Sequence, residues 1–185
     1  MSKLILIIGP PASGKSTLAA RLGREFSLPV IDKDAIKELL FDQIGIGDRA
    51  WSKQLGGAAY ELFHFLLEWM GSSCPTLILE GNFARQFESE PFTRLGRQFG
   101  HHYLQVNCYA TGELLLARFR TRALGRLRHP GHRDELNLEE MRPTLERGRT
   151  EPVAIPGACL EYNSSVGNES EYRKVHAAVE AFLSE

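Results

Sequence analysis

The strongest constraint on the fold of this chain is a glycine-rich motif near its N-terminus. Residues 9–16 read GPPASGKS and match the pattern G-x-x-x-x-G-K-[ST] at every fixed position. The motif directly follows residues 3–8, an aliphatic run typical of a strand buried on both faces. It directly precedes residues 16–26, where apolar side chains recur at helical spacing. Because this pattern cradles phosphates between a strand and a helix, the sequence predicts a phosphate-binding loop.

Each fixed residue of this loop has a chemical reason. Gly9 and Gly14 allow the backbone to curl so that successive N–H groups point at a β-phosphate, where the helix dipole also favours an anion. Lys15 is expected between the β- and γ-phosphates, and Ser16 is expected to give its hydroxyl to Mg²⁺, so that ATP and Mg²⁺ are the expected cofactors. Thr17 fits a helix start better than a ligand. The residues predicted to contact the nucleotide are Gly9, Pro10, Pro11, Ala12, Ser13, Gly14, Lys15, Ser16 and Thr17.

Strand and helix patterns alternate along the rest of the chain. Short apolar runs predict four more strands, at residues 29–31, 76–79, 103–108 and 158–162. Helical spacing predicts helices over residues 34–43, 48–70, 91–99, 113–124, 138–147 and 171–183. This alternation predicts an α/β fold with a doubly wound, five-stranded parallel sheet. A length of 185 residues fits one domain over residues 1–185.

The overall charge argues against large anionic partners. A net charge of −1 gives the chain no electrostatic reason to coat nucleic acid or an anionic membrane. The apolar run at the N-terminus is too short to span a membrane or to form a signal peptide, so we expect a cytoplasmic protein. Three widely spaced cysteines, Cys74, Cys108 and Cys159, are expected to be reduced, buried thiols.

Polar residues follow the second and third predicted strands, where ligands of parallel sheets bind. A kinase needs a carboxylate to accept the proton of the attacking hydroxyl, and Asp34 is the candidate base. Alternatively, Asp32 or Asp34 caps the helix that follows. Glu80 ends the third strand and is the candidate acid for Mg²⁺ through water, the alternative being a surface glutamate at a strand exit. Asn82 is a candidate substrate residue.

A basic segment lies in the second half of the chain, with six arginines between residues 118 and 133. Arg118 and Arg122 are spaced to share a helix face, and a guanidinium suits phosphate oxygens. Arg126 and Arg128 lie in a stretch with Gly and Pro that could close over ATP, which predicts a lid over residues 118–135. Arg118, Arg122 and Arg126 are therefore candidate catalytic residues, and the alternative is a solvated, charged helix.

The motifs together resemble the AAA-domain P-loop kinase family. They are residues 9–17, residues 31–37 (IDKDAIK), residues 79–83 (LEGNF) and residues 128–132 (RHPGH). This family looks like a relative of 5′-hydroxyl polynucleotide kinase, chloramphenicol phosphotransferase and the zeta toxins. The resemblance implies a three-layer αβα P-loop NTPase fold of the nucleoside-monophosphate-kinase type.

The resemblance also implies roles for single residues. In polynucleotide kinases an Asp-x-x-Arg motif after the second strand activates the acceptor hydroxyl, and Asp34 and Lys37 occupy its positions here. Lysine in place of arginine weakens bidentate recognition of an acceptor-side phosphate, which disfavours a polynucleotide substrate. Their Asp-x-Asn motif is matched by Glu80 and Asn82. Asp34, Lys37 and Asn82 are thus the candidate substrate residues.

We therefore predict an ATP-dependent phosphotransferase that moves the γ-phosphoryl group to a hydroxyl of a small molecule. The alternatives are a 5′-hydroxyl nucleic-acid kinase and a nucleotide-binding ATPase or regulator without an acceptor. Glycine follows Glu80, whereas mechanical ATPases usually carry a second acid there, which favours the kinase. An aromatic set could line an acceptor pocket or belong to the core: Trp51, Tyr60, Phe63, His64 and Phe83.

Overall fold

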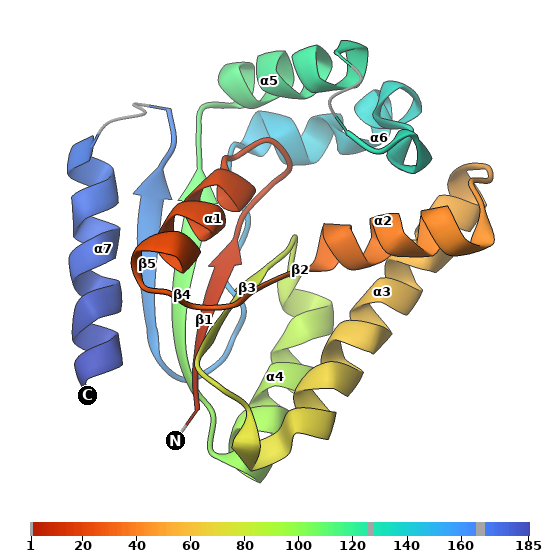
Figure 1. Ribbon diagram of the computed structural model, residues 1–185. Helices are drawn as coiled ribbons and strands as arrows, with labels where there is room; N and C mark the ends of the chain where they lie inside the picture. The colour runs from red at the N-terminus through yellow and green to blue at the C-terminus, as the bar shows by residue number, and fades with distance from the viewer. Residues whose placement is uncertain (1, 126–127, 166–168) are drawn as a thin grey trace.

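The computed structural model describes residues 2–125, 128–165 and 169–185. The strands are β1 (Lys3–Ile8), β2 (Val30–Asp32), β3 (Leu77–Glu80), β4 (His102–Tyr109) and β5 (Ala158–Asn163). The helices are α1 (Lys15–Glu25), α2 (Lys33–Ile44), α3 (Arg49–Met70), α4 (Arg85–Phe99), α5 (Gly112–Leu124), α6 (Asp134–Arg147) and α7 (Glu169–Ser184). Two short 3₁₀ turns are η1 (Gly71–Ser73) and η2 (Pro130–His132). Figure 1 shows their arrangement.

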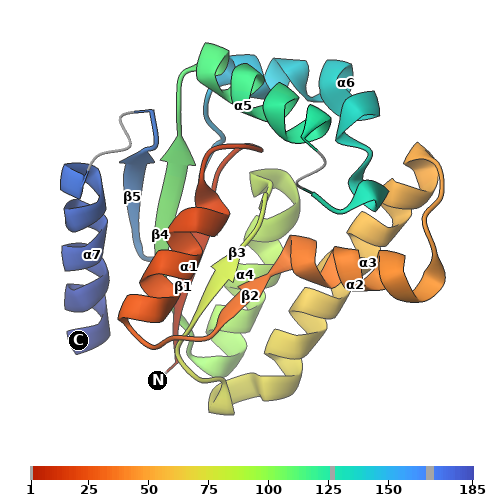
Figure 2. The same cartoon turned by 45° about the horizontal axis from the view of Figure 1, so that its top comes forward.

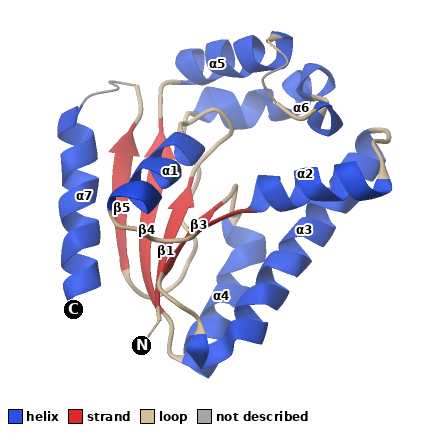
Figure 3. Cartoon of the chain, viewed as in Figure 1, coloured by secondary structure: helices blue, strands red, loops and turns tan. Residues whose placement is uncertain are grey.

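The strands form one parallel sheet in the order β2-β3-β1-β4-β5, which confirms the predicted α/β fold (Figure 3). Strand β1 lies at the centre, and all of its residues from Leu4 to Ile8 are fully buried, as expected for a strand covered on both faces. Strand β3 lies between β1 and β2, so that Glu80 pairs with Ile7 on one side and Asp32 on the other. The ends of the first three strands therefore meet at one edge of the sheet.

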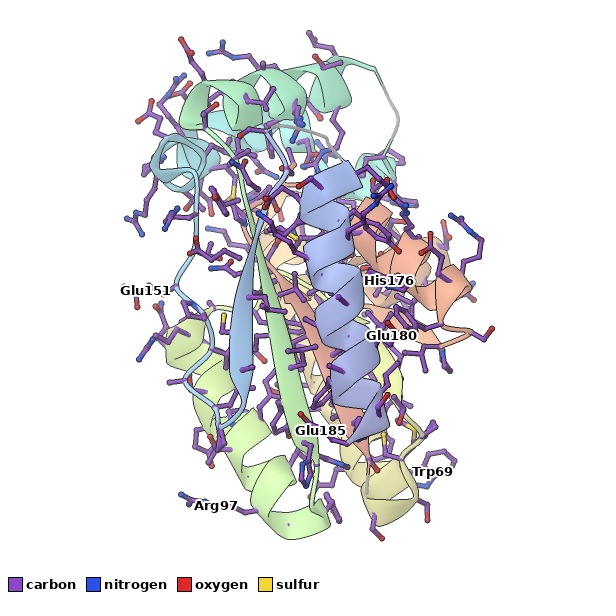
Figure 4. All side chains as sticks on the ribbon, turned by 90° about the vertical axis from the view of Figure 1, so that its left-hand side faces the viewer. Trp69, Arg97, Glu151, His176, Glu180 and Glu185 are labelled. Carbon is purple, nitrogen blue, oxygen red and sulfur yellow. The ribbon has the colours of Figure 1, made fainter. Side chains whose placement is uncertain are left out.

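Helices cover both faces of this sheet, giving the three-layer αβα arrangement. On one face α1 and α7 bury Leu18, Leu22 and Val175 against the sheet. Figure 4, in which α7 faces the viewer, shows this helix lying along β4 and β5 with His176, Glu180 and Glu185 on it. On the other face α3 and α4 pack through Phe63, Leu67, Phe92 and Leu95. This face contains the larger aromatic cluster.

Helices α5 and α6 pack on each other above the strand ends (Figure 2). Their small core consists of Leu115, Phe119 and Leu145 together with Ala110, and Ala12 of the glycine-rich loop packs against it. This contact fixes the α5–α6 pair beside the loop between β1 and α1. It positions the basic segment close to the expected phosphate site.

Three predictions from the sequence, two helix starts and the burial of one cysteine, differ from the structure. Helix α4 begins at Arg85, before Pro91, because burial of Phe92 and Leu95 outweighs the cost of a proline within the helix. Helix α6 begins at Asp134 and not at residue 138, and its acidic first turn suits the positive end of the helix dipole. Of the three free cysteines, Cys159 is exposed, because β5 is an edge strand.

No helix among the described residues has both the length and the apolar character needed to cross a membrane.

Candidate active site

The loop between β1 and α1 has the geometry of an anion cradle. A side chain at Gly9 would place its Cβ 2.3 Å from the carbonyl oxygen of Cys108, and Gly14 has a φ of +82°, so both positions require glycine. Gly14 caps α1 without a side-chain hydrogen bond, and the first turn contains no acidic residue. The N–H groups at this helix end are therefore available to an anion, and the helix dipole favours one there.

Lys15 and Glu80 form a buried pair at the mouth of this loop. The Nζ of Lys15 donates to the carbonyl oxygen of Pro10 at 2.9 Å and lies 3.9 Å from Oε1 of Glu80. Burial lowers the pKa of Lys15, and Glu80 opposes that shift. Burial raises the pKa of Glu80, Lys15 opposes the rise and the neighbouring Asp32 adds to it. A buried cation with one distant carboxylate partner is suited to an incoming anion.

An oxygen cluster lies beside Lys15. The hydroxyl of Ser16 donates to Oε2 of Glu80 at 3.0 Å, and Asp32 pairs with Glu80 across the β2–β3 ladder. Hydroxyl and carboxylate oxygens are the ligands that Mg²⁺ prefers, either directly or through its water shell. The residues present therefore fit a magnesium ion, with Ser16 and Glu80 as the predicted pair. Asp32, which the sequence analysis considered only as a helix cap, is a further acid beside them.

A cleft of about 930 Å³ runs across this edge of the sheet. Its middle is formed by the phosphate loop with Lys15 and Ser16. One end is lined by Arg21, Ala117, Arg118, Thr121, Tyr162, Ser164 and Tyr172. The other end is lined by Asp32, Asp34, Glu38, Glu80, Asn82 and Arg128. The cleft thus has two chemically different ends, one with aromatic rings and one rich in carboxylates.

Asp34 lies at the carboxylate-rich end and does not cap its helix. The side chain of Asp32 accepts a hydrogen bond from the backbone N–H of Asp34 at 2.7 Å, so Asp32 is the N-cap of α2. One carboxylate oxygen of Asp34 lies 2.6 Å from Nζ of Lys33, and the other contacts the guanidinium of Arg128. The carboxylate of Asp34 is therefore available for chemistry once these cations find other partners.

Asn82 and Lys37 occupy different places at this end. Asn82 lines the cleft, its Oδ1 is buried without a hydrogen-bond partner among the described residues, and its carbonyl accepts a hydrogen bond from Tyr60. Lys37 instead lies between α2 and α3, where its Nζ donates to Ser52 at 3.0 Å. Burial lowers the pKa of Lys37 to about 8, and Lys33 adds to the shift. A role of Lys37 toward an acceptor would require it to leave Ser52.

The aromatic set belongs to the core more than to the cleft. Phe63 and Phe83 are each 1% exposed and pack with Phe92. His64 lies 2.9 Å from Glu88, and Trp51 donates to a backbone carbonyl at the end of α2. In the described part of the chain, the residues that line the cleft include none of the five aromatic candidates.

The arginines of the basic segment divide between the two ends of the cleft. Arg118 donates to the hydroxyl and the carbonyl of Ser164, at 3.0 and 2.9 Å, at the aromatic end. Arg122 and Arg128 lie near Lys15, whose pKa their charges lower after the larger effect of burial. Arg126 lies outside the described residues. Arg128, which the sequence analysis placed in the lid but not among the catalytic candidates, contacts Asp34 directly.

Residues 128–132 hold the basic segment against α2. His129 stacks on Phe41 with ring centroids 5.4 Å apart and lies 3.1 Å from Asp42, and His132 lies 2.9 Å from Glu38. Burial, and after it nearby Arg128, lowers the pKa of His132. Because a carboxylate accepts, the Nε2–H of His132 donates to Glu38. Residues 128–132 of the predicted lid thus pack on the helix that carries Asp34.

Comparison with known proteins gives the family. The sequence model described as "AAA domain" matches residues 4–147. The chain belongs to the AAA domain family. A candidate kinase from Chloroflexus aurantiacus J-10-fl is 30% identical, with 98% of each chain covered and a TM-score of 0.88. This AAA domain chain therefore has a full-length structural relative.

Other known proteins are similar to this chain in fold alone or over a short stretch of sequence. A sugar kinase from Janibacter sp. HTCC2649 has a TM-score of 0.55 at 14% identity, over 100% of this chain and 95% of that one. A gluconokinase from Sinorhizobium meliloti 1021 has a TM-score of 0.51 at 14% identity, over 98% and 94%. The tRNA dimethylallyltransferase of Phytoplasma australiense is 34% identical over 67 residues, 36% of this chain and 22% of that protein. The chain thus spans about a fifth of that curated relative.

Substituting Gly131 tests the contact between residues 128–132 and α2 in this AAA domain protein. A Cβ at Gly131 would lie 2.4 Å from the ring of Phe41, which is itself buried. We expect Gly131→Ala to lower the free energy of unfolding by about 1–3 kcal/mol, because the buried Phe41 ring, which packs on His129 and His132, would have to shift. Urea unfolding measures the change. Gly57→Ala on α3 is the matched control, because apart from its chain neighbours and the backbone of its own helix its Cβ would meet no described atom within 4 Å. Equal losses of stability in both variants would contradict the contact between Gly131 and Phe41.

Proposed function

We propose that this protein transfers the γ-phosphoryl group of ATP to a hydroxyl of a small molecule. The observation that carries this proposal is the placement of Asp34 in the same cleft as Lys15 and Ser16, directly after β2, which β3 separates from β1. A kinase needs a general base beyond the phosphate loop, where the acceptor hydroxyl binds, and Asp34 is a carboxylate at that place. The two cations that contact it, Lys33 and Arg128, can take other partners when an acceptor binds.

In this proposal Asp34 accepts the proton of the acceptor hydroxyl while the hydroxyl oxygen bonds to the γ-phosphorus. The bond between that phosphorus and the β–γ bridging oxygen breaks, and ADP leaves. Lys15, Arg122 and Arg128 stabilise the negative charge of the transferred group, because guanidinium and ammonium groups that are fixed in place need little reorganisation. Asn82, with its unpartnered Oδ1, accepts a hydrogen bond from the acceptor.

Ser16 and Glu80 would hold Mg²⁺ in this proposal, with Asp32 as a further acid behind Glu80. A bound magnesium ion neutralises charge on the β- and γ-phosphates. The chain's own contribution is to fix these oxygens: the hydrogen bond from Ser16 orients Glu80, and the β2–β3 ladder holds Asp32 beside it.

The nucleobase would bind at the aromatic end of the cleft. Arg118 is fixed there by its two hydrogen bonds to Ser164, Tyr162 and Tyr172 line the same end, and the guanidinium of Arg21 lies 3.3 Å from the ring centroid of Tyr172. A planar guanidinium and aromatic rings suit the flat face of a base. Arg118 thus contributes to nucleotide binding in this proposal, and Arg122 and Arg128 contribute to catalysis.

A small, hydroxylated acceptor is favoured over a nucleic-acid 5′ end. The acceptor end is lined by Asp32, Asp34, Glu38 and Glu80, which repel a polyanion, and Lys37 is turned toward Ser52. The names of the similar proteins support the same class, because they include a candidate kinase, a sugar kinase and a gluconokinase.

The test is a screen for ATP-dependent phosphorylation of sugars, nucleosides, amino alcohols and oligonucleotide 5′ ends, with ADP formation as the readout. We expect acceptor-dependent ADP release with a small hydroxylated compound. Phosphorylation of oligonucleotides alone would overturn the proposed acceptor class. Release of ADP at the same rate with and without every acceptor would overturn phosphoryl transfer in favour of an ATPase.

A further inference from the structure

Two arginines face the phosphate loop from the α5–α6 side. Arg122 and Arg128 both line the nucleotide cleft, and their charges act on Lys15 at the loop. The Nη2 of Arg122 is buried and has no hydrogen-bond partner among the described residues. Three cations therefore converge on one space, and an arginine donor there is still unpaired. Such a cluster is unfavourable unless an anion occupies the space or a carboxylate supports it.

Asp134 supplies that carboxylate from behind. It is 7% exposed, and it is the first residue of α6. Its Oδ2 lies 2.9 Å from Nε of Arg122, as an ion contact that is not aligned for a hydrogen bond, and its Oδ1 accepts from Nη1 of Arg128 at 3.3 Å. Both arginines line the cleft, whereas Asp134 contacts them from the neighbouring cavity inside the basic segment.

We propose that Asp134 is a positioning residue, which holds Arg122 and Arg128 together and directs their free donors at the terminal phosphate of the bound nucleotide. This inference rests on the proposed function. Asp134 does not touch the reacting atoms; it acts through the two arginines, which come from α5 and from the loop before η2.

The physical reason is mutual repulsion and side-chain entropy. Two long cationic side chains repel each other, and fixing each one freely in the cleft costs conformational entropy. A carboxylate shared by both removes the repulsion and fixes both geometries at once, and its position at the start of α6 stabilises its negative charge through the helix dipole. Without it, Arg128 retains Asp34 as its carboxylate partner and is drawn toward the candidate base.

The inference predicts a specific loss of preference for a triphosphate. Calorimetry should give the dissociation constants of Mg-ADP and of a non-hydrolysable Mg-ATP analogue for the wild type, Asp134→Asn and Glu135→Gln. We expect the wild type to prefer the analogue, and Asp134→Asn to lose at least fivefold of that preference while its affinity for ADP changes less than twofold. Glu135 is the exposed neighbouring acid, and its variant should behave as the wild type.

Two further variants separate positioning from a general structural effect. In the background of Arg122→Gln, adding Asp134→Asn should have a smaller effect than alone, because one of the two arginines through which Asp134 acts is already absent. Asp134→Glu keeps the charge but displaces it by one methylene, so it should fold and lose part of the preference. It also serves as the test if the asparagine variant does not fold.

The outcomes distinguish this inference from the proposed function. A wild type that binds neither nucleotide would overturn the proposed function. A wild type that binds both equally, or an Asp134→Asn variant that keeps the full preference for the analogue, would overturn the role of Asp134 and leave nucleotide binding intact. Equal losses for ADP and the analogue would assign Asp134 to folding alone.

Discussion

Replacing Lys15 with alanine should abolish the stabilisation of the protein by Mg-ATP. At a nucleotide concentration of about 100 times the dissociation constant, binding stabilises a folded protein by about 2.7 kcal/mol. For a chain of this size that corresponds to a rise in melting temperature of about 5–10 °C. The ammonium of Lys15 is the buried cation of the phosphate loop, held at Pro10 and beside Glu80, so its loss leaves an uncompensated carboxylate where phosphates should bind.

The melting temperature should be measured with and without Mg-ATP for each variant. The difference is needed because removing Lys15 also leaves Glu80 buried without its cationic partner, which lowers the stability of the free protein. Lys53→Ala removes an exposed lysine of α3 and should keep the full response to nucleotide. An undiminished rise in melting temperature for Lys15→Ala would contradict the assignment of the phosphate loop.

Replacing Asp34 with asparagine should lower phosphoryl transfer by about 10²-fold or more and leave the affinity for Mg-ATP nearly unchanged. The loss of a positioned general base has about this effect on rate. Folding should survive because Asp32, and not Asp34, caps α2. The nucleotide site should also survive, because Lys15 and Ser16 lie on the neighbouring loop and depend on Glu80 and not on Asp34.

Transfer to the acceptor found in the screen and binding of Mg-ATP should be measured on the same preparation of the Asp34→Asn variant. Asp42→Asn is the matched control, since Asp42 lies on the same helix and also pairs with a residue of the basic segment, His129. If transfer by Asp34→Asn stays near the wild-type rate, Asp34 serves structure and Glu80 or Asp32 becomes the candidate base. If binding of ATP disappears as well, the acceptor end of the cleft is misplaced.

Local sequence determined the phosphate loop and the type of fold. The fixed residues of the motif and the alternation of apolar runs with helical spacing are short-range patterns, because they reflect the steric needs of a backbone turn and the burial of single faces. The parallel sheet and its five strands follow from these patterns. The polar residues after the second and third strands were also visible, because strand ends are defined where an apolar run stops.

Tertiary structure decided which of these residues meet. The order of the strands inserts β3 between β1 and β2, which places Glu80 between Ile7 and Asp32. No local pattern encodes this order. From the sequence, either Asp32 or Asp34 could cap the helix. Only the fold shows the hydrogen bond from the backbone N–H of Asp34 to the side chain of Asp32.

The arginines of the basic segment show most clearly what the sequence determined and what the tertiary structure decided. Their clustering and their suitability for phosphate could be read from the sequence, yet Arg118 lies with Ser164 at one end of the cleft and Arg128 with Asp34 at the other. Arg128 and Asp34 are 94 residues apart, and their contact depends on how His129 and η2 pack on α2. The sequence by itself determined which groups are present and at which strand or helix end. The packing of distant elements determined which charges face each other, because long side chains choose partners by distance in space.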